Sequence, residues 1–337
     1  MKPRFQIKRR TRIVTAGSCF AQHFSKALVA RRYRWLDFEP GPIGLTDQQR
    51  KDYHYGTFSF RTGNIYTPRM LWQWLSWALT GAHPPQEVWE KDGRFYDSFR
   101  PGVEPGGFVS VEELMRSREE TLAAIAAAVR GASVLVFTMG LTEAWQDQVT
   151  GVEYAVCPGT VAGRFDPDRH RFVNHGFAAL FRDMRAALRL MVRANRGLRL
   201  LLTVSPVPLT ATASGQHVLT ATSHSKSLLR AVASELVALE GRVDYFPSYE
   251  IITHPAYRGR FFAPNLRSVL PEGVDHVMAQ FFHDQAAVFG GAAAAVPVVR
   301  EPQPERLEPE EPDLSEADEL RCEEEILAAF APDQRHG

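Results

Sequence analysis

Residues 133–138, SVLVFT, form an uninterrupted apolar run of the kind that makes a strand buried on both faces of a parallel sheet. A helical segment precedes this run, beginning at a capping box of Ser110 and Glu113 and ending at Gly131. The same alternation recurs, with expected strands at 12–16, 198–205 and 243–246 and expected helices at 20–32, 177–196, 225–240 and 271–286. Repeated strand–helix units predict an α/β fold in three layers, a central parallel sheet with helices on both faces.

The composition predicts one large folded unit. The chain has 337 residues, of which 45% are hydrophobic and 11% aromatic, so there is material for a sizeable core. We expect a single domain over residues 1–300, with long loop insertions at about 35–110 and 145–175. Within the first insertion, the tryptophan-rich stretch 71–77 (LWQWLSW) predicts a buried helix.

Charge divides the chain into two blocks. The whole chain has 39 basic and 39 acidic residues, but residues 1–300 hold 36 and 26 of them, and residues 301–337 hold 3 and 13. The body therefore carries +10 and the tail −10, and the basic body favours an anionic substrate such as an acidic polysaccharide. The proline- and glutamate-rich tail is expected to be disordered, with a short helix at 319–330. It either solubilises the protein or docks on the body or a partner.

Several classes of protein lose support. Three widely spaced cysteines and no CxxC pair argue against a disulfide scaffold or a cysteine zinc site. Neither GxGxxG nor GxxxxGK[ST] follows a strand, so no nucleotide cofactor is expected, and no nucleic-acid recognition motif appears. Without a secretory h-region or an apolar run of about 18 residues, we expect a cytoplasmic protein with no membrane span. The loop with Asp166, Asp168, His170 and His175 has no regular metal-site spacing, so no metal is expected.

Polar residues follow the expected strands, and ligands of parallel α/β sheets bind at that edge. Ser18 stands in GSCFA, residues 17–21, where a strand meets a helix and helix-start amides can stabilise an oxyanion. The simpler alternative is that Ser18 only caps the helix. Gly140 and Thr142 follow the next strand, and a polar loop with His217 follows the one after.

The pentapeptide 17–21 and several further blocks resemble the GSCFA family in their order. These blocks are GNIYTP at 63–68, FTMGLTEAW at 137–145, CPG at 157–159, TVSPVPL at 203–209, SKSLLR at 225–230 and YFPSYEI at 245–251. The family resembles the GDSL/SGNH esterases and acyltransferases, which implies a flavodoxin-like (SGNH-like) fold. It also implies an esterase or O-acyltransferase of a carbohydrate-linked acyl ester.

The resemblance assigns roles to individual residues. Ser18 would be the nucleophile and its N–H the first oxyanion donor. Gly63, with Asn64 beside it, would match a second motif of that group, and Gly140 and Thr142 fall at its Gly-x-Asn. Aromatic residues that could stack on a sugar, or simply belong to the core, are Tyr53, Tyr55, Tyr66 and Trp145.

One block departs from the family pattern. Asn265 and Ser268 stand where an Asp-x-x-His pair is expected, and neither can act as a base near neutral pH. Another loop at the same edge would then supply the base, and a Ser18–His217–Glu250 triad is the arrangement we expect. The alternatives are a surface-loop His217, a Glu250 paired with an arginine such as Arg260 or Arg267, and a base from elsewhere or no base at all. Candidates for that other base are His276, next to Asp275 in the last helix, and His254. With no base, the protein would be a non-catalytic binding or assembly module that keeps the fold.

Overall fold

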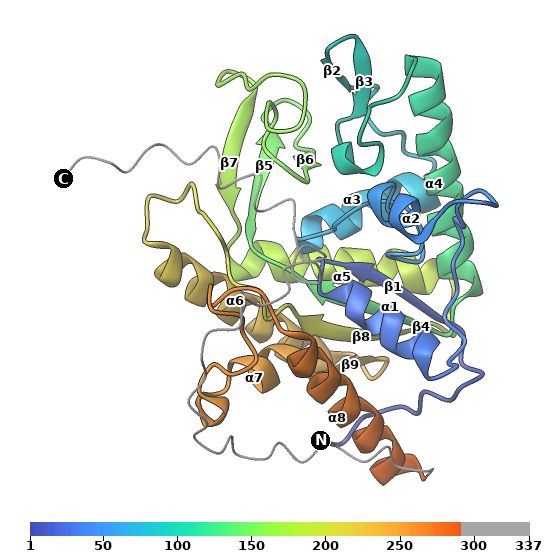
Figure 1. The fold of residues 1–337 in the computed structure, drawn as a ribbon, viewed down its shortest axis with the longest axis vertical. Helices are drawn as coiled ribbons and strands as arrows, with labels where there is room; N and C mark the ends of the chain where they lie inside the picture. The colour runs from blue at the N-terminus through green and yellow to red at the C-terminus, as the bar shows by residue number, and fades with distance from the viewer. Residues whose placement is uncertain (291–337) are drawn as a thin grey trace.

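A computed structural model describes residues 1–290, and the expected acidic tail and its helix at 319–330 lie outside this range. Four strands form the central sheet in the order β1-β4-β8-β9, and every neighbouring pair is parallel (Figure 1). These strands are β1 (Ile13–Gly17), β4 (Val134–Met139), β8 (Arg199–Val204) and β9 (Val243–Tyr245). The predicted α/β class with a central parallel sheet is confirmed.

The sheet is buried on both faces because its strands are apolar at nearly every position. All six residues of β4 are buried. Val134 and Val136 belong to one hydrophobic cluster and Leu135 and Phe137 to another, as the period of two in a strand requires. Two separate cores therefore lie on the two sides of one sheet.

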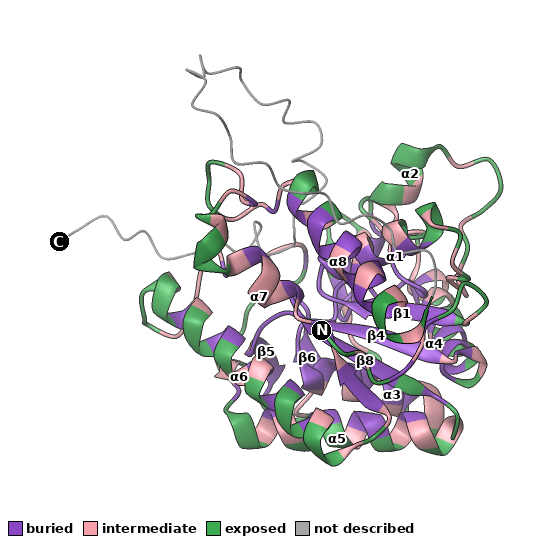
Figure 2. Cartoon of the chain, turned by 90° about the horizontal axis from the view of Figure 1, so that it is seen from below, coloured by how far each residue is buried: buried purple, intermediate pink, exposed green. Residues whose placement is uncertain are grey.

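Helices supply the outer layers of both cores. The helices of the first face are α1 (Ala21–Ala30), α7 (Ser248–Thr253) and α8 (Pro271–Phe289). Those of the second face are α3 (Pro68–Thr80), α4 (Val111–Gly131), α5 (Phe177–Ala194) and α6 (Val218–Leu239). Seen from below, the strands run between α1 and α8 on one side and α3 and α5 on the other (Figure 2). The tryptophan-rich stretch lies in α3, with Trp74 and Trp77 buried, as predicted.

The two insertions contain secondary structure that the sequence did not reveal. The first holds α2 (Asp47–Asp52), the hairpin β2 (Val88–Lys91) and β3 (Arg94–Asp97), and the short η1 (Pro101–Val103), besides α3. The second holds most of an antiparallel sheet in the order β6-β5-β7. Its strands are β5 (Glu143–Asp147), β6 (Glu153–Tyr154) and β7 (His170–Asn174). These strands are short and rich in polar residues, so they carry no alternating pattern.

One short segment lies along the edge of β1 that faces away from β4. Ile13 N–H donates to the Arg34 carbonyl at 3.0 Å, and Leu36 N–H donates to the Ile13 carbonyl at 2.9 Å, which forms a parallel bridge at Trp35. Residues 34–36 thus pair with one edge of β1, and β4, later in the chain, pairs with the opposite edge. The order in which successive segments are added to the sheet therefore reverses at β1.

The start of α4 agrees with the predicted capping box in part. The Ser110 hydroxyl accepts the Glu113 N–H at 3.2 Å, but the Glu113 carboxylate accepts the N–H of Val109, one residue before the cap. Ser110 is therefore the group that satisfies the first turn of α4.

Replacing Ser110 with alanine should lower the free energy of unfolding by about 1 kcal/mol, because one helix-start N–H loses its acceptor. Urea denaturation of the variant would measure this, with Ser110→Asp as the control that keeps an acceptor and should stay near wild type. Equal losses in both variants would show that the cap is not the source of the effect.

Candidate active site

Ser18 directly follows β1, and Gly17 makes its position possible. Gly17 has φ +133°, and a Cβ there would lie 2.3 Å from the carbonyl oxygen of Thr138 on β4. Only glycine lets the two backbones approach this closely. The Ser18 N–H then donates to the same Thr138 carbonyl at 2.9 Å.

The Ser18 side chain is buried without a partner. Ser18 is 1% exposed, and its hydroxyl has no hydrogen bond within residues 1–290. Helix α1 begins three residues later, and its N-cap Phe20 has no side-chain cap bond, so Ser18 does not cap the helix. A buried hydroxyl that satisfies nothing is costly. Ser18 is therefore a candidate for chemistry rather than for structure.

The segments that the resemblance grouped with Ser18 lie against it. A Cβ on Gly140 would stand 3.1 Å from the Ser18 Cβ and 2.8 Å from the Tyr66 ring. Gly140 N–H donates to the Tyr66 carbonyl at 2.9 Å, and Ile65 N–H donates to the Gly17 carbonyl at 2.8 Å. The segment 63–66, which contains Gly63 and the buried Asn64, is thus held against the ends of β1 and β4.

Most of the expected oxyanion donors are already engaged within the protein. Besides the Ser18 amide, the Gly140 N–H is taken by Tyr66, and the Thr142 hydroxyl donates to Asn174 Oδ1 at 2.7 Å. The amides of Cys19 and Phe20, at the start of α1, make no hydrogen bond within the part of the chain that the structure describes. These two amides, at the positive end of the helix dipole, are donors next to Ser18 that no described group occupies.

The expected triad is not assembled in this structure. His217 is exposed and is the N-cap of α6, where its Nδ1 accepts the Leu219 N–H at 3.3 Å. This cap explains why α6 begins at Val218, earlier than predicted. Glu250 is bound to Arg230 at 2.5 Å and to the Tyr245 hydroxyl at 2.8 Å. Within residues 1–290, His217 and Glu250 form no hydrogen bond or ion pair with each other or with Ser18, and the arginine partner of Glu250 is Arg230 rather than Arg260 or Arg267.

The other expected bases are also occupied elsewhere. His276 lies in α8, as predicted, where its Nε2 meets the Tyr257 hydroxyl at 3.0 Å and its ring stacks on Phe261. Burial, with the nearby Arg260 charge, lowers the pKa of His276, so its neutral form is favoured. The ring of His254 accepts the Ala256 N–H at 3.2 Å.

The replaced Asp-x-x-His block forms a turn closed on itself. Asn265 Nδ2 donates to the Ser268 hydroxyl at 2.9 Å, and Asn265 Oδ1 accepts the N–H groups of Arg267 and Ser268. These bonds satisfy the two side chains locally. The turn therefore offers no proton acceptor for Ser18.

A histidine–carboxylate pair that the sequence did not reveal lies near this edge. His175 Nε2 is hydrogen-bonded to Glu153 Oε1, and Glu153 Oε2 accepts the Thr67 hydroxyl at 2.7 Å. Glu153 is fully buried. The Gln73 side chain accepts the Glu153 N–H through Oε1 at 2.9 Å and donates from Nε2 to the Glu153 carbonyl at 3.0 Å. His175 Nδ1 makes no hydrogen bond to residues 1–290. No local sequence signal marks this pair. Glu153 lies in β6 and His175 directly follows β7, and the two strands are brought together by β5, which pairs with both.

The pair is tied to the segments around Ser18. His175 N–H donates to the Thr142 carbonyl at 2.9 Å, two residues beyond Gly140. Thr67, which contacts Glu153, directly follows Tyr66. The sheet β6-β5-β7 thus holds this histidine–carboxylate pair against the segments that follow Gly140 and Tyr66.

Helix α6 supports the loop after β4 from the other side. Lys226, 2% exposed, donates to the Gly140 carbonyl at 2.6 Å, and the Ser225 hydroxyl accepts the Thr142 N–H at 3.0 Å. Both residues belong to the SKSLLR block, whose role the sequence left open. They hold Gly140 and Thr142 in place.

The other expected features make no hydrogen bond with the Ser18 hydroxyl within residues 1–290. Among residues 1–290, no cluster of three or more His, Cys, Asp or Glu side chains is arranged to hold a metal ion. Burial raises the pKa of Cys157 to about 11, so its thiol stays protonated. Trp145 packs edge-on against Phe165 and Phe172.

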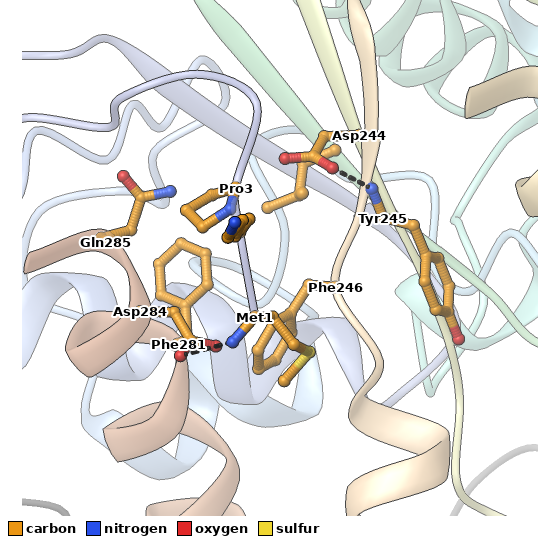
Figure 3. A pocket seen from close by; sticks show the side chains of 10 residues that line it. Met1, Pro3, Asp244, Tyr245, Phe246, Phe281, Asp284 and Gln285 are labelled. Carbon is orange, nitrogen blue, oxygen red and sulfur yellow. Dashed lines mark hydrogen bonds and ion pairs between the residues drawn. The ribbon is translucent and has the colours of Figure 1, made fainter. Parts of the chain in front are cut away.

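A small pocket lies beside β9, between the first residues of the chain and α8 (Figure 3). Its lining includes Leu201, Asp244, Phe246 and Phe281, and it does not include Ser18 or Gly140. It is therefore separate from the candidate site. Across the described residues, every helix is too short or too polar to act as a membrane span.

Comparison with known families agrees with the blocks around Ser18. The model of the GSCFA family matches residues 12–281, which include all four strands of the central sheet and the loops at their carboxyl ends. Comparison with curated proteins and with solved structures gives no significant match. Because the family model covers most of the chain, the protein belongs to the GSCFA family.

Proposed function

We propose that the protein is a serine esterase or O-acyltransferase that acts on a carbohydrate-linked acyl ester through Ser18. The observation that carries this proposal is the Ser18 hydroxyl, buried and unpartnered at the carboxyl end of β1. The free amides at the start of α1 lie one and two residues away, suited to an oxyanion.

The strand order supports an SGNH-like, flavodoxin-like fold. If residues 34–36 are counted as an edge strand, the order becomes 2-1-3-4-5, which is that of flavodoxin-like sheets. In such sheets the ligand binds at the strand ends where the order reverses. That point lies between β1 and β4, where Ser18 and Gly140 meet.

The proposed reaction has two steps. The Ser18 oxygen attacks the ester carbonyl and passes its proton to a base, which gives the proton to the departing alcohol as the ester C–O bond breaks. The base then takes the proton of a water or an acceptor hydroxyl as its oxygen attacks the acyl-serine, and it returns that proton to the Ser18 oxygen as the bond between Ser18 and the acyl group breaks. We assign the proton transfers to His175, with Glu153 orienting its ring, because this is the histidine–carboxylate pair tied to Thr142 and to the segment next to Tyr66.

The test of the proposal is detection of the acyl-enzyme. Purified protein is quenched during turnover of p-nitrophenyl acetate, and the peptide containing Ser18 is analysed by mass spectrometry. An added acetyl group on Ser18 is the expected result. An acetyl group found only on lysines or on other serines would contradict the proposal.

His175→Gln and Glu153→Gln should each lower kcat/KM by at least about 100-fold, because each removes one half of the proton-transfer pair. Kinetics with p-nitrophenyl acetate between pH 5 and 9 would measure this. His170→Gln is the matched control, since His170 Nδ1 only accepts the Asp166 N–H in the same region. Loss of activity in the control alone, or unchanged pH profiles in both variants, would contradict this role.

A second candidate is a binding or assembly module that keeps the fold without turnover. The closed turn of Asn265 and Ser268, where an acid–base pair is expected, favours it. This candidate predicts that acetylated sugars bind without being cleaved and that Ser18→Ala leaves their affinity unchanged.

A further inference from the structure

Helix α5 carries a row of arginines on its outer face. Arg182, Arg185, Arg189 and Arg193, called the arginine row below, are spaced by three, four and four residues and are all exposed. Three- and four-residue steps place side chains on one face of a helix. The opposite face is buried in the core, through residues that include Leu180, Met184 and Met191. Figure 2 shows α5 as an outer helix with exposed positions turned away from the sheet.

The arginine row has almost no counter-charge. Asp183 is the only acidic residue between Phe177 and Arg199, and it is buried and bound to Arg182 at 3.0 Å. Within residues 1–290, neither Arg185, Arg189 nor Arg193 forms an ion pair. No acidic side chain among the described residues therefore compensates the charges of these three guanidinium groups.

The helical neighbours of these arginines add repulsion. At three and four residues from Arg189 stand Arg185, Ala186, Val192 and Arg193. Like charges at this spacing destabilise a helix. Arg116 on α4, another exposed position, shows the ordinary arrangement, because its corresponding neighbours include Glu112, Glu119 and Glu120. The charges of Arg185 and Arg189 are therefore not placed to stabilise α5.

The basic surface continues past the end of α5. Arg196 and Arg199 are exposed beyond it. Arg242 approaches from the loop between α6 and β9, and its guanidinium donates to the Arg196 carbonyl at 2.9 Å. At its other end, α5 begins just after His175, whose N–H is bonded to Thr142. Helix α5 thus starts at the edge of the sheet where Ser18 lies, and the arginine row, which begins five residues into the helix, runs away from that edge for about 16 Å.

We propose that the arginine row binds a linear acidic polysaccharide whose carboxylates pair with successive guanidinium groups. Arginine binds carboxylate through two parallel hydrogen bonds, which suits repeated acidic units along one chain. The choice of a carbohydrate rests on the proposed function, of which this surface would extend the substrate site.

The shape of the surface favours a single glycan chain over other polyanions. A nucleic-acid duplex presents two phosphate strands, whereas the cations form one row. Single-stranded nucleic acid is held by aromatic platforms between the cations. The aromatic residues beside the row are Phe177 and Phe181. Instead of offering free faces to bases, their rings stack on each other, and the Arg185 guanidinium lies over the Phe181 ring.

The test measures binding of the full chain to fluorescent oligogalacturonate by anisotropy at 50 and 200 mM NaCl. The double variant Arg185→Gln/Arg189→Gln should bind at least about tenfold more weakly than wild type and show a shallower salt dependence. Arg116→Gln is the matched control and should stay within about twofold of wild type. The melting temperature of the double variant should not fall, since it removes a like-charge pair.

The outcomes separate this inference from the proposed function. Equal affinity of wild type and double variant, or no preference for oligogalacturonate over neutral dextran, would overturn the inference even if Ser18 turns over esters. Stronger arginine-row-dependent binding to poly(dT) or to phosphatidylserine vesicles would overturn it in favour of those partners. Ser18→Ala should bind oligogalacturonate like wild type, so the expected binding supports the inference even where no ester is cleaved.

Discussion

Replacing Ser18 with alanine is expected to lower kcat/KM for p-nitrophenyl acetate and acetylated sugars by at least about 10³-fold, to near the uncatalysed rate. The variant keeps the fold because the lost hydroxyl has no hydrogen-bond partner within residues 1–290, so its removal leaves no described group unsatisfied. It removes the atom that forms the acyl-enzyme, and the remaining site could then only bind the ester. Initial rates and the melting temperature would be measured together.

Ser205→Ala is the matched control for this experiment. Ser205 follows β8 as Ser18 follows β1 and is likewise buried, but its hydroxyl accepts the Val207 N–H at 3.3 Å. We expect the control to keep most of the activity and to lose some stability. Equal turnover by Ser18→Ala and wild type would eliminate the nucleophile role and leave the binding-module alternative.

Gly17→Ala should cost at least about 4 kcal/mol of stability, enough to unfold a large fraction of the protein. The new methyl group would lie 2.3 Å from the Thr138 carbonyl oxygen and 2.7 Å from the Thr138 nitrogen, and both are backbone atoms of a central strand. The φ of +133° adds strain for any residue with a Cβ. Relief would require β1 to separate from β4.

Chemical denaturation of purified Gly17→Ala would measure this loss. Gly106→Ala is the control, because a Cβ at Gly106 meets no atom within 4 Å and its φ is not in the left-handed region. The control should change the free energy of unfolding by less than about 0.5 kcal/mol. A Gly17→Ala protein as stable as wild type would show that β1 and β4 can separate at little cost.

Local sequence pattern was sufficient for the central sheet and most of its helices. The apolar run at 133–138 became β4, and the helices at 177–196 and 271–286 became α5 and α8 with small shifts at their ends. It was not sufficient for the β6-β5-β7 sheet, whose short strands contain residues such as Glu153 and Arg171. Such strands are defined by their partners rather than by their own side-chain period.

The site divides in the same way. Ser18 and Gly140 could be placed at one edge of the sheet because they directly follow predicted strands, and the block with Gly63 was grouped with them by the family resemblance. The base that we propose could not be predicted, because the partners of a histidine depend on contacts between distant segments. His217 was drawn into capping α6 and Glu250 into a pair with Arg230, whereas Glu153 and His175 met across β5.

By itself, the sequence determined the α/β class, the central parallel strands and the place of Ser18, because periodicity and strand-end turns are properties of neighbouring residues. The tertiary structure alone decided which polar side chains are free for chemistry and which are already satisfied. That choice depends on hydrogen bonds between segments tens of residues apart, and a buried polar group takes whichever partner the packed chain places within reach.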